Sequence, residues 1–229
     1  MDHQHAHQNS NMNKRKPKGP IKFNLTLNEE QKIAKNEIIN NTVTLLKGQA
    51  GSGKTLLACQ CALDMLFNRQ IEKIIITRPV VEAADPIGFL PGGMKEKMDP
   101  WLAPIYANLY MLYEKMHIDK LVEEQKIEIL PFAFVRGRTF VNAFVIVDEC
   151  QNVNHNQTEM IIGRLGLNSY MVFCGDTSQI DLRNKKESGI DFFKILETRV
   201  EGVKVITLKE NHRHPIVPKV LDIYKEYQS

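Results

Sequence analysis

The sequence predicts a three-layer α/β domain built around a mainly parallel sheet. Short apolar runs rich in β-branched residues recur at 43–47, 73–77, 127–131, 143–147, 170–174 and 203–208. Near-continuous apolar runs of this length are typical of strands that are buried on both faces of a parallel sheet. Between the runs lie longer stretches with helical spacing. Alternation of strands and helices indicates a sheet that is covered by helices on both sides.

The expected helices occupy the connections between these runs. Asn28 is a candidate N-cap that is followed by two acidic residues, and Ile33, Ala34 and Ile38 recur at helical spacing, so a helix is expected to open there. Further helix-like stretches cover 54–68, 94–116, 156–165 and 189–197. After the second run, the helix-breaking residues are expected to keep the following segment from being one helix; they are Pro79, Pro86, Pro91, Gly92, Gly93 and Pro100.

Length and charge set limits on the whole chain. With 229 residues and 26.3 kDa, it has room for one domain, or for one domain with an appendage. A hydrophobic content of 43% and a charged content of 25% exclude a wholly disordered chain. The formal net charge of +3 resides in residues 1–20, so the remaining body is neutral. Any affinity of the body for nucleic acid must therefore come from local patches.

The first 20 residues are rich in His, Gln, Asn and Lys and predict a disordered basic tail. Histidines at 3, 5 and 7 also make a metal-binding tract conceivable, and the run KRKPK could contact phosphates nonspecifically; a solvated tail is favoured over both. The chain has no run of 18 apolar residues and no secretory signal. Its cysteines, which are expected to be buried free thiols, are Cys59, Cys61, Cys150 and Cys174. These features predict a cytoplasmic protein without a membrane span.

A complete phosphate-binding motif follows the first apolar run. Residues 48–55 read GQAGSGKT and match G-x-x-x-x-G-K-[ST] in full. Glycines let such a loop wrap closely around phosphate oxygens, while backbone N–H groups and the following helix N-terminus supply positive potential. Lys54 is expected to reach the β- and γ-phosphates and Thr55 to bind Mg²⁺. The predicted nucleotide-binding residues are Gly48, Gln49, Ala50, Gly51, Ser52, Gly53, Lys54 and Thr55.

The fourth apolar run ends in two carboxylates, Asp148 and Glu149. Ligands of parallel sheets bind at the carboxyl ends of the strands, so Asp148 is expected beside the phosphate loop as a Mg²⁺ ligand. Glu149 can polarise a water for attack on the γ-phosphate, which is hydrolase chemistry. Together the motifs predict a Mg²⁺-dependent nucleoside triphosphatase that prefers ATP. A P-loop kinase is the alternative enzyme.

Two further residues are candidates for the catalytic site. Gln179 follows the fifth run, and a neutral amide there can hydrogen-bond both a γ-phosphate oxygen and the attacking water. Arg213 follows the last run and is the best candidate for an arginine finger, because a planar cation suits the charge on the transferring phosphoryl group. The structural alternatives are a polar turn for Gln179 and a surface arginine for Arg213.

These motifs resemble the PhoH family, the phosphate-starvation-inducible P-loop ATPases of bacteria and their phages. The resemblance rests on GQAGSGKT, the run TRPVVEAADPIGFLPGGMKEKMDPWLAPIY from Thr77, RGRT from Arg136, FVIVDECQN, GDTSQID and RHP from Arg213. It extends from about Phe23 to Tyr227. The block TRP…GFLPG…KEK…DP is far more specific than the ATPase motifs. The family in turn resembles the first RecA-like domain of superfamily-one helicases.

The resemblance implies a RecA-like P-loop ATPase domain over residues 21–229. It implies ATP and Mg²⁺ as cofactors, a helicase-like activity on single-stranded nucleic acid with RNA ahead of DNA, and homo-oligomeric rings, with hexamers expected. It also places Gln31 at the position of the glutamine that reads adenine in those helicases. A nucleotide-switched regulatory scaffold that touches no nucleic acid stays the alternative.

Two departures from the family pattern affect the expected mechanism. Cys150 stands where the family often has alanine, which should leave Asp148 and Glu149 in place. The sequence also stops at Ser229, without the second RecA-like domain that supplies the γ-phosphate arginine in superfamily-one helicases. We therefore expect either slow hydrolysis or an Arg213 that acts across a subunit boundary in a head-to-tail ring.

Residues 78–116 have no counterpart in a minimal P-loop domain. Here Lys95, Lys97, Trp101 and Tyr106 mix cations with aromatic rings, as in single-strand binding tracks; a subunit interface with Met94, Met98 and Met111 explains them equally well. Two interpretations likewise stay open for Arg136 and Arg138: they contact nucleic-acid phosphates, or they form structural ion pairs.

Overall fold

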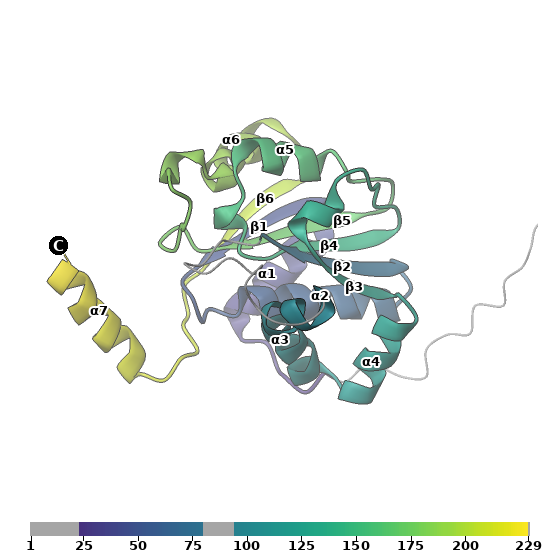
Figure 1. The fold of residues 1–229 in the computed structure, drawn as a ribbon, viewed down its shortest axis with the longest axis horizontal. Helices are drawn as coiled ribbons and strands as arrows, with labels where there is room; N and C mark the ends of the chain where they lie inside the picture. Colours follow the sequence, from purple (N-terminus) through teal and green to yellow (C-terminus); the bar gives the residue numbers. More distant parts are fainter. Residues whose placement is uncertain (1–22, 80–93, 229) are drawn as a thin grey trace, which may run out of the picture.

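The computed structural model describes residues 23–79 and 94–228 and contains a six-stranded sheet (Figure 1). The strands are β1 (Val43–Gly48), β2 (Lys73–Arg78), β3 (Ile127–Pro131), β4 (Ala143–Val147), β5 (Tyr170–Gly175) and β6 (Val203–Leu208). Their order is β3-β2-β4-β5-β1-β6, and every neighbouring pair is parallel. The prediction of a mainly parallel sheet is confirmed, and each strand matches its predicted run to within one residue.

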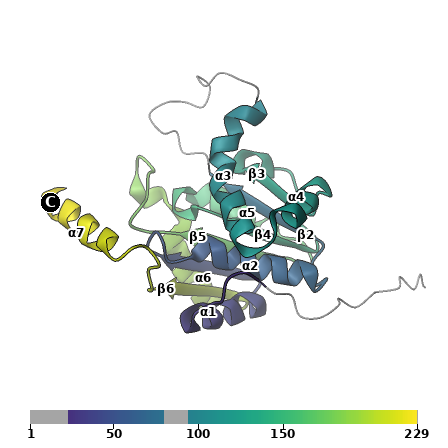
Figure 2. The same ribbon diagram turned by 90° about the horizontal axis from the view of Figure 1, so that it is seen from below.

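Helices cover both faces of this sheet (Figures 1 and 2). One face carries α1 (Glu29–Asn40), α2 (Lys54–Phe67), α3 (Met94–Leu112) and α4 (Lys115–Glu123); the other carries α5 (His155–Ile162) and α6 (Phe193–Arg199). Alternate residues of each strand enter two separate cores. In β4, for example, Phe144 and Ile146 pack toward α2, whereas Val145 and Val147 pack toward α5 and α6. This period of two produces the three predicted layers.

The first helix begins where the sequence predicts it. Asn28 Oδ1 accepts a hydrogen bond from the backbone N–H of Gln31 (2.7 Å), and Gln31 Oε1 accepts one from the N–H of Asn28 (3.2 Å). This reciprocal capping box satisfies two of the N–H groups that have no partner within the helix. The cap also fixes the Gln31 side chain, which is buried.

The segment after β2 differs from the prediction. The helix expected over 94–116 ends at Leu112, and α4 begins at Lys115. Pro100 does not break the helix that the sequence predicts over 94–116, because α3 continues through it. Each proline in a helix removes one backbone hydrogen bond. Burial of Ile105, Leu109 and Leu112, all completely inaccessible to solvent, offsets that loss.

Other boundaries also shift. Helix α5 begins one residue before its predicted start and ends three residues before its predicted end, and α6 starts after a 3₁₀ turn at Gly189–Phe192. The sequence analysis missed α4 as a separate helix and also missed α7 (Ile216–Gln228), which extends away from the body in both ribbon views (Figures 1 and 2). The predictions for the tail (1–20), for Pro86, Pro91, Gly92 and Gly93, and for the side chains of Lys95, Lys97, Met94 and Met98 lie outside the described residues.

The expectation about the cysteines is met in the described ranges. All four cysteines are buried and unpaired, as predicted. Within 23–79 and 94–228, no helix combines the length and the hydrophobicity that crossing a bilayer would require.

Candidate active site

The carboxyl ends of the central strands meet at one pocket of about 580 Å³. This volume lies within the range of pockets that hold small ligands. Residues 49–53 follow β1, and Asp148 follows β4. The Asp148 N–H donates to the Thr77 carbonyl of β2 (2.8 Å). The predicted site residues that line the pocket are Gln31, Ala50, Gly51, Gly53, Lys54, Thr55, Asp148, Glu149 and Arg213. Of the remaining predicted residues, Gly48, Gln49 and Ser52 belong to the same loop, while Gln179 lies apart from the pocket lining.

The shape of the loop depends on its glycines. Gly51 and Gly53 have φ angles of +91° and +81°, a region that side chains disfavour. A Cβ atom at Gly48 would lie 2.6 Å from Ser52 Oγ and 2.7 Å from the Leu208 carbonyl oxygen. The loop leads directly into α2, whose first turn has no side-chain cap. Its N–H groups therefore stay available to an anion.

Lys54 and Ser52 are in positions that fit a triphosphate. Lys54 Nζ donates to the carbonyl oxygens of Gly48 (2.7 Å) and Gln49 (3.1 Å), so the ammonium lies curled over the loop. The buried hydroxyl of Ser52 has no hydrogen-bond partner in the described part of the chain. Phosphate oxygens would offer the ammonium stronger, charged acceptors than these carbonyl groups.

Thr55 and Asp148, the two residues predicted to bind Mg²⁺, lie side by side at the foot of the P-loop. Thr55 Oγ1 donates to Asp148 Oδ1 over 2.7 Å, although the two residues are 93 positions apart. Burial raises the pKa of Asp148; the Thr55 hydrogen bond opposes this effect, and the neighbouring Glu149 charge adds to it. A hydroxyl and a carboxylate are the hard oxygen ligands that Mg²⁺ prefers. The residues therefore fit a Mg²⁺ ion, whose charge would stabilise the Asp148 anion.

Glu149 is held in place from two sides. Its backbone is left-handed, with a φ of +51°, which is rare for a residue other than glycine. Glu149 Oε1 lies 3.6 Å from the Arg78 guanidinium, and Glu149 Oε2 accepts a hydrogen bond from Gln151 Nε2 (2.7 Å). Strained backbones of this kind persist where the surroundings over-determine them, often in active sites. The arrangement suits a carboxylate that must point in one direction.

The PhoH-like protein family matches residues 25–225, nearly the whole described chain. This chain belongs to the PhoH-like family. It is 42% identical over 194 residues to a PhoH-like protein of Synechocystis sp., covering 84% of this chain and 59% of that protein. A PhoH-like protein of Bacillus subtilis is 45% identical over 179 residues, 77% of this chain and 56% of the relative. The chain thus spans somewhat more than half the length of these relatives.

A solved structure supports the fold of this PhoH-like chain. The large terminase of a thermophilic bacteriophage superposes with a TM-score of 0.55 and 8% sequence identity, covering 86% of this chain and 50% of the terminase chain. The likeness concerns the fold alone. The predicted RecA-like α/β class and the family resemblance are both confirmed.

Gln151 is a site residue of this PhoH-like protein that the sequence analysis missed. It is 1% exposed. Its Nε2 donates to Glu149 and also to the Gln179 carbonyl (3.2 Å), while its Oε1 accepts from Asp176 N–H (3.1 Å). Asp176 in turn accepts from the N–H of Ala50 in the P-loop (2.8 Å). Gln151 therefore joins the carboxyl ends of β4 and β5, and only its place inside FVIVDECQN could have drawn attention to it.

Gln179 reaches this network through its backbone. The Gln179 carbonyl meets Gln151, but the Gln179 side chain is exposed. A direct role of that side chain at the γ-phosphate thus stays a prediction.

The segment after β6 wraps around the P-loop of its own chain. His212 N–H donates to the Gly51 carbonyl (3.0 Å), and Asn211 Nδ2 donates to the Ala50 carbonyl (3.3 Å). The Arg213 side chain lies so close to Gly51 that a Cβ there would be 2.6 Å from Arg213 Cγ. Arg213 therefore lines the nucleotide pocket of the same chain, which is the position an arginine acting in cis would take. Its action across a subunit boundary stays a prediction that these contacts do not support.

The remaining arginine and aromatic candidates are partly accounted for. Arg138 donates to Glu128 (2.9 Å) and lies 5.8 Å from the centre of the Phe140 ring, so the ion-pair alternative holds for it. Arg136 is exposed. Tyr106 stacks on Tyr110 with ring centres 5.8 Å apart.

Proposed function

We propose that this PhoH-like chain hydrolyses ATP in the presence of Mg²⁺. The observation that carries the proposal is the Thr55–Asp148 hydrogen bond at the foot of the P-loop, with Glu149 oriented beside it. Lys54 exchanges its loop carbonyls for phosphate oxygens, and Glu149 takes the proton of the attacking water. Thr55 and Asp148 would hold a Mg²⁺ ion, which would supply neutralisation of the negative charge on the triphosphate.

Two variants test the roles separately. Glu149→Gln should retain ATP binding but lower phosphate release by about 10²-fold or more, the usual contribution of a positioned general base. Lys54→Ala should weaken ATP binding itself. Unchanged turnover in Glu149→Gln would contradict the assignment. Product analysis separates a hydrolase from a P-loop kinase, because a kinase transfers the phosphoryl group to an acceptor and releases little free phosphate.

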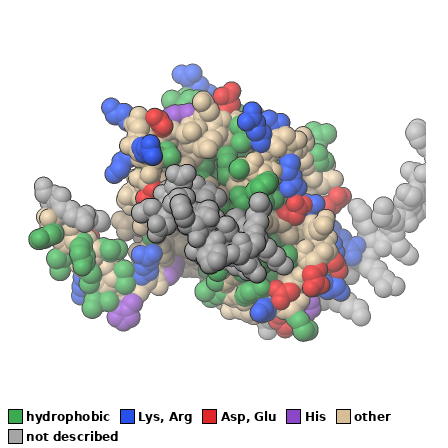
Figure 3. Space-filling model, viewed as in Figure 1, with side chains coloured by type: hydrophobic (Ala, Val, Ile, Leu, Met, Phe, Trp, Pro, Cys, Tyr) green, Lys and Arg blue, Asp and Glu red, His purple; other side chains and the backbone are tan. Residues whose placement is uncertain are grey.

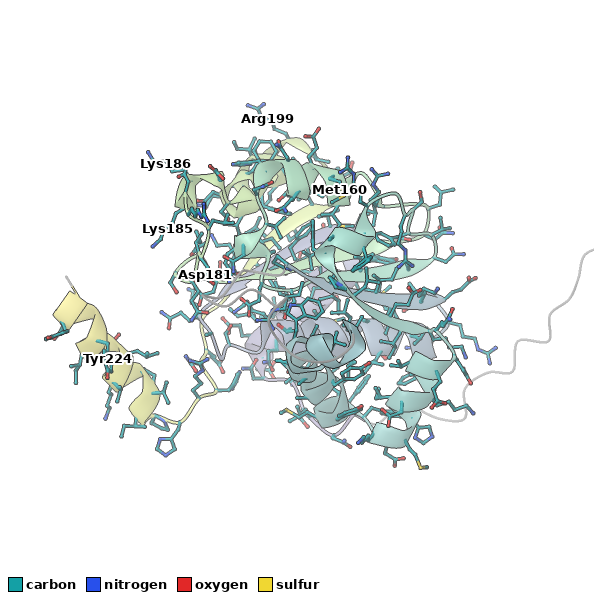
Figure 4. All side chains as sticks on the ribbon, viewed as in Figure 1. Met160, Asp181, Lys185, Lys186, Arg199 and Tyr224 are labelled. Carbon is teal, nitrogen blue, oxygen red and sulfur yellow. The ribbon has the colours of Figure 1, made fainter. Side chains whose placement is uncertain are left out.

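We further propose single-stranded nucleic acid, RNA ahead of DNA, as the partner of the ATPase. Support comes from exposed cations in the loop that follows Gln179. Lys185 and Lys186 point outward at the edge of the molecule (Figure 4), Arg183 lies beside them in sequence, and none of the three has an ion-pair partner in the described ranges. The loop is attached to the active site, because Asp181 N–H donates to Asn152 Oδ1 (2.8 Å), next to Gln151.

Charge reversal tests this partner. The double variant Lys185→Glu/Lys186→Glu should weaken oligonucleotide binding and any stimulation of ATPase activity, and binding by the wild type should fall steeply with salt. Arg199→Glu is a matched control, since Arg199 is an exposed cation at the far end of α6 (Figure 4). If wild-type protein neither binds single strands at low salt nor changes its turnover, the nucleotide-switched scaffold becomes the better description.

We also propose that copies of this chain associate head to tail, with a hexameric ring as the form implied by the family resemblance. Support comes from α7, which stands away from the body and presents apolar side chains to solvent (Figure 3). The exposed residues are Ile216, Val220, Leu221, Ile223, Tyr224 and Tyr227. An amphipathic helix gains stability only by covering such a face.

The apolar groove between α5 and α6 is the surface proposed to receive α7 of a neighbouring copy. The groove measures about 600 Å³ and includes Ile162, Phe192 and Leu196. Repetition of one heterologous contact closes a ring when the rotation permits. Sedimentation should show a concentration-dependent oligomer that Leu221→Asp dissociates and Lys219→Asp, an exposed change on the same helix, affects less. A wild-type monomer at all concentrations would contradict the proposal and indicate that α7 folds back on its own chain.

A further inference from the structure

The nucleotide pocket contains a glutamine whose side chain makes no hydrogen bond to any of the described residues. Gln60 lies on α2, lines the pocket and is 5% exposed. Its Oε1 is closed to water and has no partner, and neither of its amide atoms bonds to any group in the described part of the chain. Buried amides almost always find partners, because leaving them unpaired is costly. The exception at Gln60 indicates that the missing partner belongs to a ligand.

The surroundings of Gln60 suit a flat heterocycle. Leu56 lies one helical turn before Gln60 on the same face of α2 and also lines the pocket. Leu25 and Leu27 enter from the segment before α1, and Met111 enters from α3. Asn24 N–H donates to the Leu112 carbonyl (3.1 Å), which fixes that segment against the end of α3. Apolar walls with one polar edge are the usual composition of a site for a purine base.

The residue expected to read adenine is already engaged within the protein. Gln31 Oε1 accepts from Asn28 N–H in the capping box, and Gln31 Nε2 lies 3.3 Å from His212 Nε2. Gln31 also packs against the P-loop, since a Cβ at Gly53 would lie 2.9 Å from Gln31 Nε2. Gln31 therefore joins the cap of α1 to the P-loop. Of the two glutamines among the described residues that line the pocket, Gln60 is the one whose side-chain amide makes no hydrogen bond to them.

We propose that the Gln60 carboxamide binds the N6/N7 edge of the adenine base and thereby selects ATP over GTP; the inference rests on the proposed ATPase function. An amide offers one donor and one acceptor and pairs bidentately with this edge of adenine, whereas the corresponding edge of guanine presents two acceptors, O6 and N7. The last torsion of a glutamine side chain is soft, so rotation of the carboxamide brings Oε1 to the exocyclic amine while Nε2 donates to N7.

Nucleotide titrations with Gln60→Met test the proposal. Methionine keeps the length and approximate volume of glutamine but offers no comparable hydrogen bond. Wild-type protein should bind Mg-ATP at least about tenfold more tightly than Mg-GTP, and more tightly than 7-deaza-ATP, which lacks N7. In Gln60→Met these preferences should fall below about threefold while GTP affinity stays unchanged, since one bidentate pair accounts for about tenfold or more in discrimination.

Controls separate base recognition from folding. Gln70→Met alters an exposed glutamine just after α2, and Thr44→Val removes another buried, unpartnered oxygen atom; both should keep the ATP preference. A Gln60→Met protein that melts like the wild type and still prefers ATP about tenfold overturns the proposal. If Gln60→Met does not fold, titration of the wild-type protein still tests the proposal. Equal affinity of the wild type for ATP and for 7-deaza-ATP would overturn it. Failure of wild-type protein to bind any nucleotide refutes the ATPase function itself.

Discussion

Replacing Gln151 with leucine tests whether the network behind Glu149 orients the carboxylate that we propose as the general base. The Gln151 side chain makes three hydrogen bonds, to Glu149 Oε2, the Gln179 carbonyl and Asp176 N–H. Leucine has a similar size and makes none of them. The substitution therefore leaves a buried N–H group at Asp176 without a partner and frees one side of the Glu149 carboxylate.

The expected magnitudes follow from these bonds. A buried unsatisfied N–H costs about 1–3 kcal/mol, and a hydrogen bond to a charged group contributes about 1.5–3 kcal/mol, part of which water replaces at half-buried Glu149. We expect the free energy of unfolding to fall by about 2–4 kcal/mol. Catalysis should fall by about 10- to 100-fold in kcat, because a poorly oriented base loses most of its contribution. KM for ATP should change little, since the P-loop is left intact.

Steady-state ATPase assays and urea unfolding measure the two effects on the same preparation. Gln151→Glu is a second variant: it retains an acceptor for Asp176 but places a buried carboxylate beside Glu149, so both its kcat and its stability should fall. A folded Gln151→Leu protein with wild-type kcat would refute the positioning role. A rise in KM with unchanged kcat would instead indicate that Gln151 serves nucleotide binding.

Three further predictions concern other parts of the molecule. Gly51→Ala should destabilise the protein by about 1–3 kcal/mol and abolish tight nucleotide binding, because its φ of +91° and the arginine side chain above it leave no room for Cβ; calorimetry measures both. Burial opposes the ionisation of Glu128, but hydrogen bonds from Lys73 and Arg138 outweigh it and lower the Glu128 pKa below its ordinary value. The ionised Glu128 side chain stabilises the fold at pH values above its unfolded-state pKa, and this stabilisation is lost as the pH falls through the folded-state pKa. The free energy of unfolding of Glu128→Gln should therefore depend less on pH in the acid range than that of the wild type. An unchanged pH dependence would argue against this ion-pair cluster. Finally, burial raises the pKa of Cys61 to about 12, and labelling of Cys61 by a thiol reagent should require unfolding; labelling of the native protein as fast as in denaturant would contradict the burial.

Several features were determined by the sequence itself. The six strands were predictable because a strand buried on both faces must be apolar along its whole length. The P-loop and Asp148-Glu149 were predictable because the carboxyl ends of parallel strands converge, which brings Thr55 and Asp148 together across 93 residues. The cap at Asn28 was predictable because a capping box needs only residues three positions apart.

Other features were decided only by tertiary structure. Helix α3 continues through Pro100 because its buried contacts outweigh the low helix propensity of proline. The bond from Ala50 to Asp176 joins residues 126 positions apart, and no local pattern marks either as a partner of the other. Arg213 follows a loop whose course depends on contacts with the P-loop, so its place in the pocket of its own chain could not be predicted. Gln60 occupies an ordinary helical position in the sequence, and only the packing of α3 and the segment before α1 around it leaves its amide buried and without a hydrogen-bond partner among the residues that the structure describes. Local periodicity and short-range geometry specify the elements, whereas the partners of polar side chains depend on distances that exist only after the chain has folded.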